Sequence, residues 1–292
     1  MNIKGTIKSI TNIYKKISTL GKILLFMVFL LVMLSFFRSN NKSLREGFDQ
    51  SSQFIFKKGP EIYDNFYANV YDSLINTDIS SDFEIGDIVN STNPSSESII
   101  LDVGCGTGSC VSKLSDSNLQ VIGVDVSPFM IKKSIMKYPD YKFVVGDALN
   151  IGVFSPGSFT HILCLDHIIY YFKDKRQFFN NCMDWLMPGG YLFLHVVERE
   201  KMNPVLNKNT KKTKYNDFDY IADFQQNGDN ATINEKFKFK NGKTRKQEQT
   251  LYIEDKETIL TIVQQCGFIL HGIGNVVKSS YGDQYIYIFV KA

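Results

Sequence analysis

Five short apolar runs alternate along the chain with longer segments whose apolar residues recur at helical spacing. The runs cover Ser98–Val103, Leu119–Asp125, Tyr141–Gly146, Thr160–Asp166 and Tyr191–Val197. Near-continuous apolar strands that alternate with helices are typical of a parallel sheet covered on both faces. The pattern therefore predicts an α/β domain, which we place at residues 57–292.

A different pattern occupies the start of the chain. Residues 23–37 carry no charge and follow a basic flank, residues 1–22, which has five lysines and no acid. As a helix, residues 23–37 would span about 22 Å, and counting from Leu20 with Lys22 snorkelling gives about 27 Å, against a hydrocarbon core of about 30 Å. We expect a single-pass membrane anchor. A removed signal peptide is the alternative, although residues 38–41 contain no small-x-small cleavage site.

The composition of the chain gives no indication of a nucleic-acid partner or a metal site. The polar stretch 38–56 is predicted to be a linker. The net charge of +3, much of it in the basic flank, gives no reason to expect a nucleic-acid partner. The four histidines show no ligand spacing with cysteine or acid, so we expect no metal.

The glycine-rich segment Leu101–Gly108, LDVGCGTG, is the clearest candidate for chemistry. Alternate glycines after a buried strand allow a sharp reversal and let a ligand approach bare backbone. A dinucleotide fingerprint would need glycine at position 109, where the chain has Ser109. Asp125 ends the next strand, where its carboxylate can reach two ribose hydroxyls, and Asp147 lies at the end of the third. The spacing predicts a nucleoside-binding turn.

These motifs resemble the class I S-adenosylmethionine-dependent methyltransferases, in particular their small single-domain branch, from about Tyr63 onward. The resemblance implies a doubly wound, mostly parallel seven-stranded sheet, a Rossmann-like fold. Its last two strands would be Phe268–Val276 and Tyr285–Val290, the final one antiparallel, after a helix at Lys256–Cys266.

The resemblance also implies a cofactor, S-adenosylmethionine, and a set of residues that bind it. Its methionine part would be held at the glycine turn, its ribose by Asp125, and its adenine by the residues after the second and third strands. Leu165, at the end of the fourth strand, would face the same zone. The predicted cofactor-binding residues are Asp102, Gly104, Cys105, Gly106, Asp125, Val126, Met130, Asp147, Ala148 and Leu165.

The acceptor side is less defined, because a sulfonium methyl is already activated and a general base is optional. The fourth strand runs into CLDHIIYYF, where we expect His167 and Tyr170 to serve catalysis, His167 as a base. A hydrogen-bonded His167 and a packing Tyr170 are the alternatives. His195, within the fifth strand, is expected to be a core residue.

Two further segments flank the predicted sheet. An insertion, residues 201–254, follows the fifth strand and contains a β-hairpin signal at Asn241-Gly242, which we extend with Asp219–Gln225. It would either cover the substrate pocket or merely extend the sheet. Upstream, Lys57–Leu74 resembles the tyrosine-rich helix that closes over the cofactor in related enzymes, with packing as the alternative.

The sequence therefore favours a membrane-tethered methyltransferase acting on a small molecule, a lipid or a protein. Five cysteines without framework spacing suit a reducing compartment, and the cofactor is made in the cytosol, so we expect a cytosol-facing domain. Two alternatives are a catalytically silent scaffold or virion component with the same fold, and a nucleotide-sugar or nicotinamide enzyme. Asparagine, isoleucine and lysine richness faintly resembles methyltransferase-like proteins of large DNA viruses.

Overall fold

The protein is described here by a computed structural model, which divides the chain into two units, Met1–Gln53 and Phe54–Ala292. The described residues are 18, 19, 21, 22, 26–28, 33, 54–74, 86, 91–202, 213–275 and 284–292. Most of the predicted membrane segment, 23–37, and linker residues 38–53 fall outside them. No helix among the described residues is long and apolar enough to cross a membrane. The membrane anchor stays a prediction.

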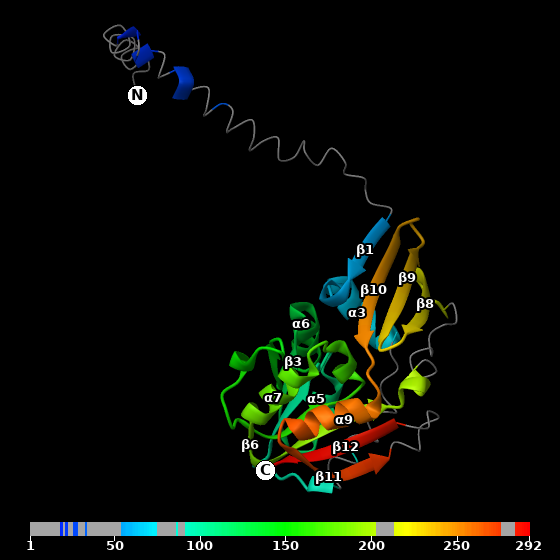
Figure 1. Cartoon of the computed structure of the whole chain (residues 1–292). Coiled ribbons are helices and arrows are strands. Elements are labelled where there is room, and N and C mark those ends of the chain that lie inside the picture. The colour runs from blue at the N-terminus through cyan, green and yellow to red at the C-terminus, as the bar shows by residue number, and fades with distance from the viewer. Residues whose placement is uncertain are drawn as a thin grey trace. The chain divides into compact units, whose positions relative to one another are not determined.

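A seven-stranded sheet forms the base of the second unit (Figure 1). Its strand order is β11-β12-β6-β5-β2-β3-β4, and β12 is antiparallel to both of its neighbours while the other pairs are parallel. The prediction of a doubly wound, mostly parallel sheet with an antiparallel last strand is confirmed. The strands are β2 Ile99–Val103, β3 Gln120–Asp125, β4 Lys142–Val145, β5 Phe159–Cys164, β6 Leu186–Val197, β11 Phe268–Asn275 and β12 Gln284–Lys291.

Alternate residues of the central strands bury their side chains on opposite faces of this sheet. In β5, Ile162 and Cys164 join one core cluster and Leu163 joins the other. The first cluster is covered by α7, Lys175–Trp185, and α9, Lys256–Gln265, and the second by α5, Ser109–Asp116, and α6, Pro128–Lys137. Burial on both faces explains why these strands are continuously apolar in the sequence.

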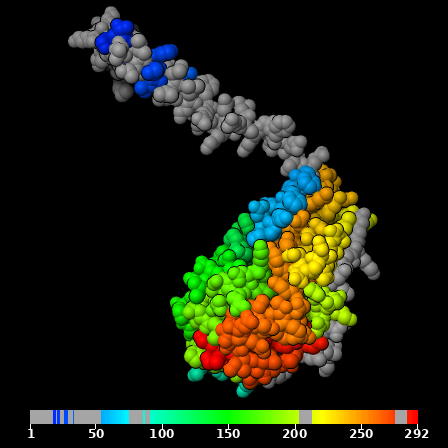
Figure 2. Space-filling model, in the orientation of Figure 1, coloured from blue at the N-terminus to red at the C-terminus, as the bar shows by residue number. Residues whose placement is uncertain are grey.

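The insertion forms a separate sheet rather than an extension of the first. Its strands are β7 Thr213–Lys214, β8 Phe218–Asn227, β9 Asn230–Phe239 and β10 Thr244–Tyr252, in the order β1-β10-β9-β8-β7. The predicted hairpin is present between β9 and β10, where Gly242 has φ +83°. The edge strand of this sheet was not predicted. It is β1, Phe54–Lys58, which pairs in parallel with β10. Residues 54–56 of the predicted linker therefore belong to a strand, beside β10 in Figure 2.

The helix predicted in the segment Lys57–Leu74 is shorter in the structure. After β1 the segment forms a 3₁₀ turn, η1 Gly59–Ile62, and then α3, Asn65–Leu74. Gly59, with φ +55°, and Pro60 separate the strand from the helix that the tyrosine spacing indicates. Ile62, Tyr67, Ala68 and Leu74 pack against aromatic residues of β8 and β9 in a third core cluster. The remaining 3₁₀ turns are η2 Ile151–Val153, η3 Ile168–Tyr171 and η4 Arg199–Lys201.

Candidate functional site

The turn that follows β2 has a backbone conformation that depends on its glycines. Gly104, Gly106 and Gly108 have φ of +71°, +53° and +87°, which side chains with a Cβ rarely adopt. A Cβ at Gly104 would lie 2.6 Å from Cδ1 of Ile168. The backbone N–H of Gly104 donates to the carbonyl of Val124 at 2.8 Å, so the turn is tied to the end of β3. Bare backbone is therefore presented beside the strand ends.

Asp125 is the carboxylate that faces this turn. Its Oδ2 accepts a hydrogen bond from the Gly106 N–H at 3.1 Å, and its Oδ1 accepts one from the Ser127 N–H at 2.7 Å. Burial raises the pKa of the carboxyl, and these two hydrogen bonds oppose the rise. Each carboxylate oxygen keeps capacity for a further donor, which suits a pair of neighbouring hydroxyls.

A cavity of about 470 Å³ opens at the carboxyl ends of the parallel strands. This is where ligands bind in open α/β sheets. All the residues predicted to bind the cofactor line it, namely Asp102, Gly104, Cys105, Gly106, Asp125, Val126, Met130, Asp147, Ala148 and Leu165. Sequence motifs that are spread over more than sixty residues are thus brought to one surface, while the role of each residue stays a prediction.

The structure does not bring the two predicted catalytic residues into this cavity. Asp166 and His167 both adopt left-handed conformations, with φ +47° and +65°, at the end of β5. This double reversal leaves Asp166 lining the cavity, whereas the His167 ring lies against the buried His195 ring, with 4.5 Å between centroids. His195 is a core residue, as expected, and its Nε2 is 3.0 Å from Oε1 of Gln284.

Tyr170 is likewise placed away from the cavity. Its ring is buried, and its hydroxyl donates to the Val197 carbonyl at 3.1 Å and accepts from the Val197 N–H at 3.0 Å. These bonds fasten η3 to the end of β6. The next residue, Tyr171, lines the cavity instead. Of these two neighbouring tyrosines one packs and the other lines the cavity, because one residue along a 3₁₀ turn rotates a side chain by about 120°. The lining residue is Tyr171 rather than the predicted Tyr170.

The wall of the cavity opposite the cofactor-binding motifs is formed by segments that carry no sequence motif for this role. It contains Tyr63 and Tyr71 from the segment around α3, Tyr171 and Phe172 after β5, and Gln249, Thr250 and Tyr252 from β10. Burial raises the pKa of the Tyr63, Tyr71 and Tyr171 hydroxyls, so these groups stay neutral phenols. The tyrosine stripe and the insertion were visible in the sequence, but their convergence was not.

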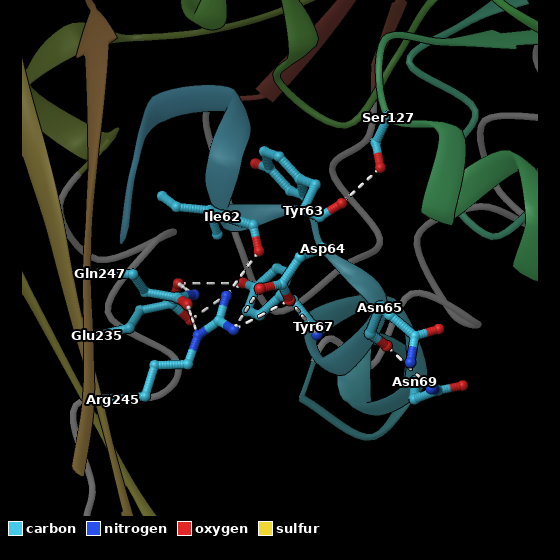
Figure 3. A network of polar contacts seen from close by, with 10 residues as sticks. All are labelled: Ile62, Tyr63, Asp64, Asn65, Tyr67, Asn69, Ser127, Glu235, Arg245 and Gln247. Atoms are coloured by element: carbon cyan, nitrogen blue, oxygen red, sulfur yellow. Dashed lines mark hydrogen bonds and ion pairs between the residues drawn. The ribbon is translucent and has the colours of Figure 1, made fainter. Parts of the chain in front are cut away.

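A buried polar network holds this wall in place (Figure 3). Arg245 of β10 donates through Nη1 to both oxygens of Asp64, at 2.9 and 2.7 Å, and through Nη2 to the Ile62 carbonyl at 2.8 Å. Its Nε donates to Oε1 of Gln247 at 2.8 Å. Tyr63, between the two anchored residues, accepts a hydrogen bond on its carbonyl from Oγ of Ser127 at 2.5 Å. The segment that carries Tyr63 is thus fixed to both the second sheet and the loop after Asp125.

Glu235 lies at the centre of the same network. Its carboxylate accepts hydrogen bonds from the Tyr67 hydroxyl at 3.1 Å, from Nε2 of Gln247 at 2.6 Å and from the Tyr220 hydroxyl. Burial raises its pKa, and these donors together with the Arg245 charge oppose the rise. Tyr67 therefore packs and bonds to the second sheet, as one interpretation of the tyrosine stripe expected, while Tyr63 and Tyr71 line the cavity and closure over the cofactor stays a prediction. No set of three or more potential metal ligands occurs in the described parts of the chain.

Comparisons with known proteins agree with this geometry. Residues 100–190 match the family model described as "Methyltransferase domain". Over 104 residues the chain is 28% identical to a ubiquinone biosynthesis O-methyltransferase of Xanthomonas euvesicatoria, covering 34% of this chain and 43% of that protein. Over 142 residues it is 27% identical to a dTDP-4-amino-2,3,4,6-tetradeoxy-D-glucose N,N-dimethyltransferase of Saccharopolyspora spinosa, covering 46% and 56%. The chain thus spans about half the length of these relatives.

The fold itself recurs in solved structures. An S-adenosylmethionine-dependent methyltransferase from Clostridium acetobutylicum superposes with a TM-score of 0.64 at 20% identity, covering 78% of this chain and 98% of that one. The expectation of a class I methyltransferase fold is therefore confirmed. The matched segment, residues 100–190, contains every predicted cofactor-binding residue, which supports S-adenosylmethionine as the ligand of the cavity.

Proposed function

We propose that the chain is an S-adenosylmethionine-dependent methyltransferase. The observation that carries the proposal is the pairing of the glycine turn with Asp125, through the 3.1 Å hydrogen bond from Gly106, at the rim of a cavity lined by all the predicted cofactor residues. The cavity residues fit a nucleoside with an amino-acid tail. They offer bare backbone where a Cβ would collide, a ribose-facing carboxylate and the apolar side chains of Val126 and Met130.

The protein's part in such a reaction is to bind, orient and exclude water. When bound, the cofactor supplies a methyl group that is already activated by its sulfonium charge. Asp125 accepts hydrogen bonds from the ribose, Asp147 and Ala148 meet the adenine edge, and the glycine turn holds the methionine part. The aromatic residues opposite exclude water from the space where the acceptor must approach in line.

The acceptor site lies between the cofactor residues and β10. Gln249, Thr250 and Tyr252 line the cavity, which supports the interpretation that the insertion covers the substrate pocket. A cavity of about 470 Å³ must hold both the cofactor and the reacting group, so the acceptor is a small molecule or the end of a protein side chain or lipid head group. The name of the Saccharopolyspora spinosa relative also gives a small-molecule acceptor, dTDP-4-amino-2,3,4,6-tetradeoxy-D-glucose.

Calorimetric titration of the full chain with S-adenosylmethionine, S-adenosylhomocysteine and the oxidised nicotinamide dinucleotide tests this function. We expect saturable binding of the first two ligands only. Asp125→Asn should weaken that binding about ten- to hundredfold, because one charge-assisted hydrogen-bond acceptor is lost. Asp140→Asn, which removes an exposed carboxylate away from the cavity, is the control. No binding to a folded sample would favour the scaffold alternative, and nicotinamide binding would favour the dinucleotide enzyme.

We further propose that residues 1–22 and 23–37 tether the enzyme to a membrane as a single-pass anchor, with the domain in the cytosol. The charge-free run supports the anchor. Basic residues flank this run on both sides, so charge does not decide the orientation; the cytosolic placement is supported by the five cysteines without framework spacing and by the cytosolic origin of the cofactor. Alkaline carbonate extraction of membranes from expressing cells tests it. We expect the full chain to stay with the membranes, and a variant with Leu30 and Leu31 replaced by lysine to be released. Release of both chains would contradict the tether.

A further inference from the structure

The acceptor side of the cavity is aromatic and offers hydrogen-bond acceptors rather than basic groups. Tyr63, Tyr171, Phe172 and Tyr252 contribute rings to its wall. Faces of aromatic rings attract cations through their quadrupole, most strongly where water is excluded. Burial raises the pKa of the Tyr63 and Tyr171 phenols, so these two side chains stay neutral and supply neither an anion nor a cation.

Asp166 adds a carboxylate to which no cofactor-binding role is assigned. The left-handed backbone at Asp166 and His167 places the accessible side chain of Asp166 at the cavity, next to Leu165. Burial is the main reason that the pKa of Tyr71 and Tyr171 is raised, and the Asp166 charge adds to the rise. Asp166 therefore lies close to the phenols of the acceptor side. Consecutive left-handed non-glycine residues are strained, and such strain concentrates at functional sites.

Gln249 supplies a second acceptor group. Its Nε2 donates to the Thr250 carbonyl at 2.8 Å, which leaves Oε1 as the atom that can receive a ligand. This oxygen is buried and has no hydrogen-bond partner in the described part of the chain. A buried unsatisfied carbonyl costs stability unless a donor arrives. An N–H group is such a donor.

Basic side chains are scarce at this wall. Among the described residues that line the cavity, Lys58 is the only lysine or arginine. Its side chain is 62% exposed, and its Nζ forms an ion pair with Glu248 at 2.7 Å. An acceptor that carries phosphate or carboxylate would meet the Asp166 carboxylate, and the one basic side chain of the described lining, Lys58, is paired with Glu248. An acceptor that carries an ammonium group would meet a carboxylate, an unsatisfied carbonyl oxygen and aromatic side chains.

We propose that the methyl acceptor is an amine and that Asp166 is the catalytic residue that binds the amine nitrogen and takes a proton from it. This inference rests on the proposed methyltransferase function. The amine enters as an ammonium group and donates hydrogen bonds to Asp166 and to Oε1 of Gln249. Asp166 takes one proton from the nitrogen. The freed lone pair forms the new N–C bond while the methyl C–S bond breaks, and the electron pair of that bond remains on sulfur. The positive charge passes from sulfur to the methylated nitrogen.

Matched amines and alcohols test this assignment. The full chain is first saturated with S-adenosylhomocysteine and then titrated with 2-phenylethylamine, cyclohexylamine and hexylamine, with the corresponding alcohols, and with phenyl phosphate. We expect amines to bind about ten- to hundredfold more tightly than their alcohols, as one charge-assisted hydrogen bond predicts. With S-adenosylmethionine, the amines that bind should gain one methyl group at nitrogen, as mass spectrometry detects.

Variants assign the preference to the residue. Asn tolerates left-handed backbone, so Asp166→Asn keeps the turn and removes the charge. It should abolish the preference for amines while S-adenosylhomocysteine affinity stays within about threefold, whereas Asp140→Asn should change neither. Equal binding of alcohols, tighter binding of phenyl phosphate, absence of amine binding, or an intact preference in Asp166→Asn would each overturn the inference alone. Failure to bind S-adenosylhomocysteine would overturn the proposed function, and this inference with it.

Discussion

Replacing Arg245 by methionine should detach the segment 59–74 from the second sheet. Arg245 is 3% exposed and forms an ion pair through Nη1 with both carboxylate oxygens of Asp64, which is 25% exposed, besides its bonds to Ile62 and Gln247. Removing one partner of a buried pair costs about 3 to 5 kcal/mol. Because Asp64 keeps partial hydration, we expect a loss near the lower end, about 3 kcal/mol. Methionine retains most of the packed stem, so the loss reports the guanidinium.

A double-mutant cycle isolates the ion pair. Asp64 also accepts the Tyr67 N–H at 3.1 Å as the cap of α3, and Asp64→Asn keeps that cap while it removes the charge. We expect a coupling energy between Arg245→Met and Asp64→Asn of about 2 kcal/mol. Arg199→Met, which removes an exposed ion pair with Asp229, should cost less than about 1 kcal/mol.

Urea unfolding followed by circular dichroism and by fluorescence of Trp185, the single tryptophan, measures these changes. Trp185 lies in the core of the main sheet, so transitions that differ between the two probes would mean that the second sheet unfolds separately. The affinity for S-adenosylhomocysteine should also fall, because Tyr63 loses its support beside Ser127. A coupling energy below about 0.5 kcal/mol would refute the reasoning.

Three further changes test other parts of the structure. Burial lowers the pKa of His161 from 6.5 to about 4, so on acidification the unfolded chain binds a proton before the folded chain does. Stability that is present above pH 6.5 should therefore be lost as the pH falls toward 4, by about 2 kcal/mol at pH 5. In urea unfolding, His161→Gln should show a smaller loss over the same pH range. Gly104→Ala should weaken S-adenosylhomocysteine binding at least tenfold in calorimetry, because its Cβ would meet Ile168 and its φ is +71°; an unchanged affinity would contradict the turn geometry. Lys175→Met should lower the unfolding free energy by about 3 kcal/mol, because the buried Nζ bonds to the Tyr252 carbonyl at 2.8 Å and pairs with a carboxylate; a loss below about 1 kcal/mol would show that this clamp is dispensable.

The cofactor side of the site could be predicted because its residues are local to strand ends. Asp102 precedes the last residue of β2, Asp125 ends β3 and Asp147 follows β4, and the carboxyl ends of parallel strands meet at one edge of the sheet. Strand periodicity and glycine spacing were therefore sufficient to bring them together. The alternation of helices and strands was sufficient for a parallel sheet covered on both faces, and the resemblance to class I methyltransferases supplied the last two strands.

The acceptor side could not be predicted in the same way. The sequence identified the segment CLDHIIYYF, but which of its side chains line the cavity depends on two consecutive left-handed residues that no glycine announces. This turn places Asp166 and Tyr171 in the lining and leaves the predicted catalytic residues His167 and Tyr170 outside it. The pairing of β1 with β10 joins distant segments through a parallel edge that carries no turn signal. Tertiary contact, rather than local pattern, decides both features.

The pairing of β1 with β10 also orders events during synthesis. Asp64 and Arg245 are separated by 181 positions, so the partner of the early segment leaves the ribosome only after most of the domain has been made. Until then Phe54 and Phe56, about half exposed even in the finished fold, have no strand beside them. Closing so long a loop is slow, and unpaired apolar edges promote aggregation. The nascent protein therefore depends on the speed at which its last third appears, and a chaperone that shields this edge should raise its yield.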